Sequence, residues 1–220
     1  MPRLFTALTF LLCSTAVADK IQRPTGFLSV PFGSAPAEVV RMLGLRGGAT
    51  VPEEMPSTFN KLELTGGNFA GQEVVKWTLE FVDRKFAAAT VTLKTEGNGM
   101  AVYQELKQNL IAKYGPAVGE KKAGKSDADK KKQGTPANNG TRREETYGKV
   151  VFWKFEPTLA DKSRSLIICT GAGPDGNEVA DESKVQVTLQ YIDETRIPTA
   201  AKRLTNPGAK TAPPVKKEDL

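Results

Sequence analysis

The chain has 220 residues, with 31 Lys and Arg against 25 Asp and Glu, and it contains no histidine. Without histidine it lacks the usual general base for a serine or cysteine nucleophile and the commonest transition-metal ligand. These numbers exclude histidine-dependent catalysis and leave enough chain for one sizeable domain.

Residues 1–18 have the pattern of a secretory signal peptide. Arg3 precedes an apolar run over residues 4–12, and Ala16-Val17-Ala18 provide a small-residue cleavage site. The apolar run is too short to span a bilayer, and the bulky residue before Cys13 argues against a lipoprotein signal. We therefore expect a periplasmic or secreted protein with no transmembrane segment after cleavage.

A first helix is expected to follow a capping residue, Ser34, with Pro36 in its first turn and Gly44 at its end. Its apolar stripe consists of Val39, Val40 and Leu43. A longer second helix is predicted over Gly99 to Tyr114, because apolar residues recur along one face and Gly115-Pro116 follow.

Alternation with period two predicts antiparallel strands in the rest of the chain. Residues 75–81 and 86–95 form a hairpin around the polar corner 83–85, with Val75, Trp77, Leu79 and Phe81 on one face and a wet opposite face. Three more strands are expected in residues 148–157, 164–172 and 183–193, and a short one covers Lys61 to Thr65. Trp77 and Trp153 are predicted to be buried on the same face of the sheet.

Two segments have the composition of unfolded chain. Residues 117–145 form a basic insertion that is almost free of large aliphatic side chains, so we expect it to be disordered. Residues 197–220 carry four prolines among lysines and are expected to form a disordered, mobile tail. The last four residues also resemble an endoplasmic-reticulum retention signal with its acids exchanged, which leaves a eukaryotic location as an alternative.

The two halves of the chain repeat one order, a helix followed by three strands. We therefore predict an α+β fold, with an antiparallel sheet of about six to seven strands, two helices on one face and a tandem α-β-β-β duplication. The expected map is a signal peptide (1–18), a first unit with the second helix (19–116), the insertion (117–145), a second three-stranded unit of the same domain (146–196) and the tail (197–220).

Gly171, Gly173 and Gly176 have the spacing of a dinucleotide-binding motif. That motif requires a helix after the glycines, whereas residues 177–183 are too few for a crossover helix. We read Gly173 to Asn177 as a turn between antiparallel strands, with residues 166–170 pairing with 185–191, and we expect no nucleotide cofactor. A weak calcium site near Asp175 stays open, although the loop lacks the glycine and the final glutamate of a calcium-binding loop.

No residue is assigned a catalytic, cofactor-binding or metal-binding role. Adjacent acids such as Glu53-Glu54 and Asp193-Glu194 point apart on a strand or helix, so surface solvation explains them better than catalysis. Cys169 lies beside isoleucines on an expected strand, which is typical of a buried thiol.

Residues 30–44 (VPFGSAPAEVVRMLG) followed by 103–116 (YQELKQNLIAKYGP) resemble small exported bacterial α+β domains. The element order is similar to the tandem helix-plus-sheet folds of the β-lactamase-inhibitor protein and of the outer-membrane assembly lipoprotein BamE. The likeness implies a fold and a binding role in the envelope, but the chain lacks the lipid attachment signal of BamE and the paired cysteines of the inhibitor.

Two functions remain open. The first is an exported, non-catalytic protein-interaction or envelope-binding domain whose partner is another envelope or extracellular protein. The second is a histidine-independent envelope hydrolase that uses carboxylates. Lys130, Lys131 and Lys132 are expected to make at most weak contact with anionic lipid or polymer, and no nucleic-acid partner is expected because the basic runs lack interleaved aromatic residues.

Overall fold

The computed structural model describes residues 22–52, 60–124 and 146–197. The expected signal peptide (1–18), residues 125–145 of the expected insertion and residues 198–220 of the expected tail lie outside the described residues. No helix in the described part of the chain is both long and apolar enough to cross a membrane.

The fold is α+β, as predicted, and its main sheet is antiparallel with eight strands, one or two more than expected. The strand order is β3-β5-β6-β10-β9-β8-β7, with β4 paired to β5 beside β3, and a separate two-stranded hairpin is formed by β1 and β2. The strands are β1 (Gly26–Phe27), β2 (Val30–Pro31), β3 (Lys61–Leu64), β4 (Asn68–Phe69), β5 (Gln72–Val82), β6 (Lys85–Leu93), β7 (Gly119–Lys122), β8 (Lys149–Phe155), β9 (Ser165–Ala172) and β10 (Gln186–Asp193).

The second helix, α2 (Gly99–Tyr114), has the bounds that the sequence predicts. The first helix, α1 (Pro36–Gly47), is longer than expected. Gly44 lies inside it, and the left-handed residue that ends it is Gly48, at φ 66°. Ser34 is not the capping residue, because Ala35 occupies that position and no side chain caps the helix.

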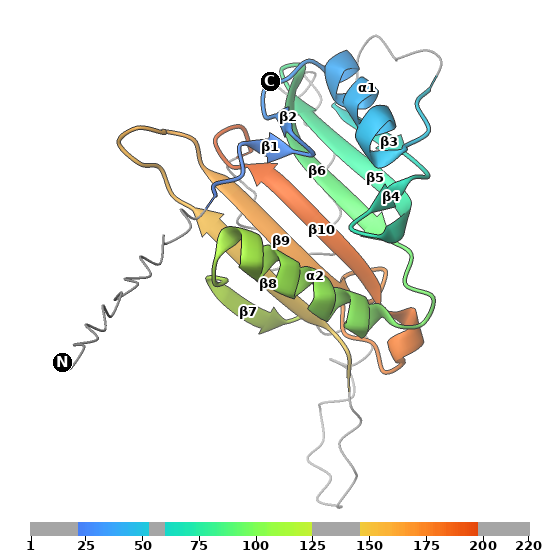
Figure 1. Ribbon diagram of the computed structural model, residues 1–220. Coiled ribbons are helices and arrows are strands. Elements are labelled where there is room, and N and C mark those ends of the chain that lie inside the picture. Colours follow the sequence, from blue (N-terminus) through green and yellow to red (C-terminus); the bar gives the residue numbers. More distant parts are fainter. Residues whose placement is uncertain (1–21, 53–59, 125–145, 198–220) are drawn as a thin grey trace, which may run out of the picture.

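Both helices and the β1–β2 hairpin lie on one side of the sheet (Figure 1). Buried residues of α1, α2 and the facing strands form one hydrophobic core there. Trp77 on β5 and Trp153 on β8 belong to this core and are 0% and 1% exposed, which confirms that both are buried on the same face.

The opposite side of the sheet is not the wet face that the period-two pattern predicts. All eight residues of β9 are buried, so this strand is covered on both faces. A second apolar cluster lies on that side, built from Ala88, Leu166, Ile168 and Ile192 with residues around them.

A β-bulge changes which residues of β5 reach the core. Val74 pairs with Leu93 and Lys76 with Thr92, so Val75 is the extra residue between them. Val74 is buried, whereas Val75 is 48% exposed. The expectation that Val75 shares a face with Trp77 is therefore wrong, because the bulge shifts the alternation by one residue.

Part of the expected insertion is ordered sheet. Gly119–Lys122 form the edge strand β7, which pairs with β8. Lysines are common on edge strands because they discourage pairing with a second sheet, and this is why composition alone reads the segment as unfolded.

Candidate functional site

The glycine motif lies in a loop, as the sequence predicts. β9 pairs antiparallel with β10 from Gln186 onward, and residues 173–185 connect the two strands. Gly176 has φ 78°, and the carboxylate of Asp175 accepts hydrogen bonds from the backbone N–H (3.1 Å) and side-chain amide (2.6 Å) of Asn177. The connection is longer than the predicted turn, because a single 3₁₀ turn (η1, Glu182–Lys184) follows it.

Metal ligands do not gather at this loop. Among the residues that the structure describes, no three His, Cys, Asp or Glu side chains stand close enough together to hold a metal ion. Both oxygens of Asp175 are used within the turn itself.

A surface groove lies beside the β1–β2 hairpin, on the side of the sheet that carries the helices. We call it the groove; its volume is about 540 Å³. The hairpin and the segment before it form one wall, and aromatic side chains and the C-terminal turns of both helices form the rest. The lining residues outside the hairpin segment are Arg46, Phe69, Lys113, Tyr114 and Tyr191.

Aromatic rings hold the hairpin in place. Phe27 stacks on Phe69, with 5.7 Å between ring centroids, and lies 5.2 Å from Tyr191 and 6.1 Å from Trp77. Tyr191 also accepts a long hydrogen bond (3.4 Å) from the hydroxyl of Tyr114. Burial raises the pKa of Tyr191, so this hydroxyl stays protonated and neutral.

Among the described residues that line the groove, some are cations and none is a carboxylate. Arg23, Arg46 and Lys113 are its charged residues. Arg46 and Lys113 each lie in the last turn of a helix, where a positive charge also compensates the helix dipole. Within the described residues neither forms an ion pair: Arg46 donates to the carbonyl oxygen of Leu28 (3.0 Å), and Lys113 lies 5.1 Å from the ring centroid of Tyr114.

The hairpin turn is strained. Leu28 and Ser29 form a two-residue loop between paired Phe27 and Val30, and both have positive φ, 47° and 61°. Such turns favour Asn and Gly. Any other residue that is held at positive φ lowers the stability of the fold by on the order of 1 kcal/mol. The buried side chains of Phe27 and Val30 and the hydrogen bond from Arg46 keep the turn in this conformation.

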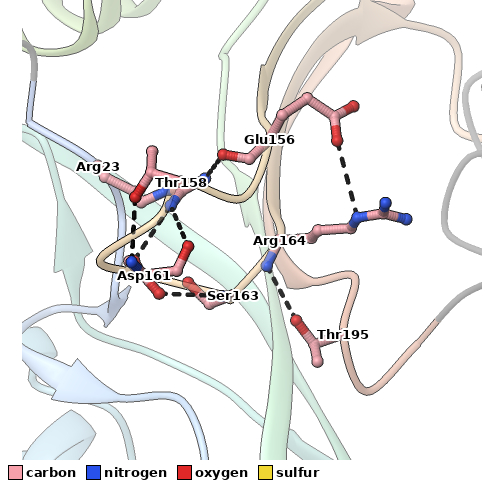
Figure 2. A network of polar contacts seen from close by, with 7 residues as sticks. All are labelled: Arg23, Glu156, Thr158, Asp161, Ser163, Arg164 and Thr195. Atoms are coloured by element: carbon pink, nitrogen blue, oxygen red, sulfur yellow. Dashed lines mark hydrogen bonds and ion pairs between the residues drawn. The ribbon is translucent and has the colours of Figure 1, made fainter.

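Figure 2 shows how the segment before the hairpin is attached to the β8–β9 loop. The guanidinium of Arg23 forms an ion pair with Asp161 (3.1 Å) and donates to the carbonyl oxygen of Glu156. The backbone N–H of Asp161 donates to the hydroxyl of Thr158, and the carboxylate of Asp161 accepts from the backbone N–H of Ser163. The backbone N–H of Arg164 donates to the hydroxyl of Thr195. Arg23 is thus already neutralised, so the charges left for a ligand are those of Arg46 and Lys113.

Two carboxyl groups near this network have opposite pKa shifts. Burial raises the pKa of Glu194, and the neighbouring charge of Glu156 raises it further. The pKa of exposed Glu156 is lowered, chiefly by a hydrogen bond from Lys154 at 2.6 Å. Asp193 and Glu194, adjacent in sequence, have different partners: Asp193 pairs with Arg196 at 3.0 Å.

Cys169 is buried on β9, as expected, and burial raises the pKa of its thiol to about 12. A thiol with that pKa is almost entirely protonated near neutral pH, so it is a poor nucleophile.

A polar cluster between α2 and β7 makes a pH-dependent contribution to stability. Glu120 on β7 accepts hydrogen bonds from Lys107 (2.6 Å) and from the hydroxyl of Tyr103 (3.1 Å). The hydrogen bond from Lys107 is the main reason that the pKa of Glu120 is lowered, and burial opposes it. A carboxyl group whose pKa falls on folding stabilises the fold above its ordinary pKa and loses that effect as the pH drops below it.

We expect Glu120→Gln to lower the free energy of unfolding by about 1 kcal/mol at pH 7, since the pair is partly exposed. The difference from the wild type should shrink as the pH falls below about 4.5. Urea titrations at several pH values measure it, with Glu105→Gln, an exposed change on α2, as the control. A difference that stays constant down to about pH 3 would show that the lost stability is not electrostatic.

The chain matches no family model, and no curated protein or solved structure is detectably similar to it. The groove, Arg46 and Lys113 were not singled out by the sequence analysis, because their side chains come from distant parts of the chain.

Proposed function

We propose that this protein is an exported, non-catalytic interaction domain, and that an acidic segment of another envelope or extracellular protein binds in the groove. The observation that carries the proposal is that Arg46 and Lys113 lie beside aromatic side chains in this groove. Among the described residues neither cation has a carboxylate partner, and no acid lines the groove.

Binding energy at protein interfaces concentrates in a few residues, and Tyr, Trp and Arg are over-represented among them. The groove offers Arg46 and Tyr114 in this way. The strained turn at Leu28 and Ser29 supports the same reading, because strained backbone tends to cluster at binding sites. A carboxylate between Arg46 and Lys113 would be partly desolvated, which strengthens its attraction to both cations.

We expect Lys113→Glu to weaken capture of the partner from envelope extract by tenfold or more, since one lost charge-assisted contact costs about 1.5–3 kcal/mol. Wild-type binding should also weaken as salt is added. The control is Lys122→Glu, an equal charge change on the exposed edge strand β7. Equal capture by wild type and Lys113→Glu, or an equal loss in the control, would rule out the groove as the binding site.

The alternative function, a hydrolase that uses carboxylates, is favoured by the opposite pKa shifts of Glu194 and Glu156. Such a pair suits a general acid and a carboxylate base or nucleophile. Glu194→Gln separates the two proposals within the capture experiment. An interaction domain keeps its partner in this variant, whereas a hydrolase that binds substrate through this pair loses it.

We also propose that the two halves arose by duplication, which would explain the likeness to the tandem folds of BamE and the β-lactamase-inhibitor protein. The sheet order supports this proposal. On one side of the centre the strands run inward from β3 through β5 to β6, and on the other from β8 through β9 to β10. Each set follows a helix in the chain, and β7 is an additional strand at the edge beyond β8. Export by a signal peptide and weak contact of Lys130, Lys131 and Lys132 with anionic lipid remain part of the proposal.

A further inference from the structure

The side of the sheet without helices has an apolar centre between polar edges. One row across the strands reads Glu80, Ala88, Ile192, Leu166 and Lys154, and these residues are direct partners in the pairing register. The next row reads Thr78, Thr90, Gln190, Ile168 and Phe152. Charged side chains stand at both ends of the first row, and aliphatic ones fill its middle.

The middle of this face is fully buried. Leu166 and Ile192 are 0% exposed, and Ile168 is 2% exposed. The cluster that contains them draws its residues from the strands and their ends, and within the described residues neither α1, α2 nor the β1–β2 hairpin contributes to it. Since both helices lie on the other side (Figure 1), a further segment is needed to exclude water from these side chains.

The same face has an unused hydrogen-bond acceptor. The side-chain oxygen Oε1 of Gln190 is buried, and no group in residues 22–52, 60–124 or 146–197 donates a hydrogen bond to it. A buried acceptor without a partner costs about 1–3 kcal/mol, so a covering segment that donates an N–H to it is favoured over a purely apolar cover.

The described chain leaves the sheet toward this face. After β10, the backbone N–H groups of Arg196 and Ile197 both donate to the carbonyl oxygen of Asp193, which reverses the chain. Ile197, the last described residue, is 9% exposed and packs in the same apolar cluster. The remaining residues, 198–220, are enough chain to cross seven strands spaced about 4.8 Å apart, since an extended residue spans about 3.3 Å.

We propose that residues 198–220 cover the second face of the sheet, pack on Leu166, Ile168 and Ile192, and donate a backbone N–H to Gln190. The small apolar residues and prolines of this segment fit a flat cover, and its lysines can stay in water. The segment is then a structural part of the domain, in place of the mobile tail that its composition predicts.

The test compares the full chain with a variant that ends at Ile197. We expect a several-fold increase in binding of the dye ANS on truncation, and a return toward the full-chain value when a synthetic peptide of residues 198–220 is added. Deletion of residues 126–144, a segment of similar length, is the control and should leave ANS binding unchanged. Equal ANS binding by the truncated and full chains would overturn the proposal, and so would strong ANS binding by the full chain.

Sedimentation measurements show whether residues 198–220 or a second copy of the chain cover this face of the sheet. A full chain that is dimeric, and that gains ANS binding when diluted to a monomer, would show that another copy covers the face and would overturn the proposal.

If the truncated chain does not fold, a spin label at Ala209→Cys tests the chain of residues 19–220, which does not contain Cys13. Buried Cys169 should not react with the label. Methyl signals of Leu166, Ile168 and Ile192 should then broaden more than those of Val39 and Val40 in the helix-side core, and uniform broadening would contradict the proposal.

Discussion

Replacing Trp77 with alanine is expected to lower the free energy of unfolding by about 3–5 kcal/mol. The side chain is completely buried, and its ring lies against Phe27 and Phe69. Its indole N–H donates to the carbonyl oxygen of Gly66 at 2.7 Å. Truncation therefore removes a large apolar group, leaves a cavity beneath the β1–β2 hairpin and leaves a carbonyl without its donor.

Chemical denaturation of the mature protein measures this loss. Trp77→Phe is the matched variant, because it keeps most of the ring but removes the N–H, and it should cost less than the alanine change. Trp153→Ala should cost about as much as Trp77→Ala, since Trp153 is buried in the same core and donates to the carbonyl oxygen of Gly115 at 2.8 Å. A loss below about 1 kcal/mol for Trp77→Ala would show that the core around the hairpin is not packed as described.

Gly67→Ala is expected to cost about 3–4 kcal/mol, for two reasons that add. Gly67 has φ 86°, a conformation in which a side chain is strained. In addition, a Cβ there would overlap the carbonyl oxygen of Gly47 at the end of α1. The backbones of the two glycine-rich segments, 47–48 and 66–67, touch at this point, so the methyl group can be accepted only if the helix end moves away.

Gly71→Ala separates the two contributions. Gly71 has nearly the same φ, 81°, but a Cβ there meets no atom within 4 Å. This variant should therefore show only the backbone strain, about 1 kcal/mol. Thermal or urea unfolding of both variants measures the difference, and equal losses would mean that the close approach of the two segments contributes nothing.

The sequence predicts best those elements whose signals are local. The bounds of α2 follow from its periodic apolar face and from Gly115-Pro116, and the loop after β9 follows from its turn residues. The end of α1 is missed because Gly44 looks like a stop signal, whereas packing of the helix against the sheet continues it to Gly47.

Features that depend on distant contacts are not predictable in this way. A β-bulge such as the one at Val75 cannot be recognised from the alternation of apolar and polar residues in the sequence. Likewise, β7 is a strand only because it pairs with β8. The groove combines residues from five separate parts of the chain, so no spacing reveals it. The run Leu166-Ile167-Ile168 does carry a usable signal, since consecutive aliphatic residues in a strand indicate burial on both faces.

The two halves of the domain meet through β6 and β10, which pair over six residues without a break, from Val187 with Leu93 to Ile192 with Ala88. One continuous sheet therefore runs beneath the groove, and the halves cannot rotate about a hinge without breaking backbone hydrogen bonds. If a partner binds in the groove as we propose, it meets a preformed site. Binding should then follow single-step kinetics, with an observed rate that rises linearly with partner concentration and shows no plateau from a slow closing step.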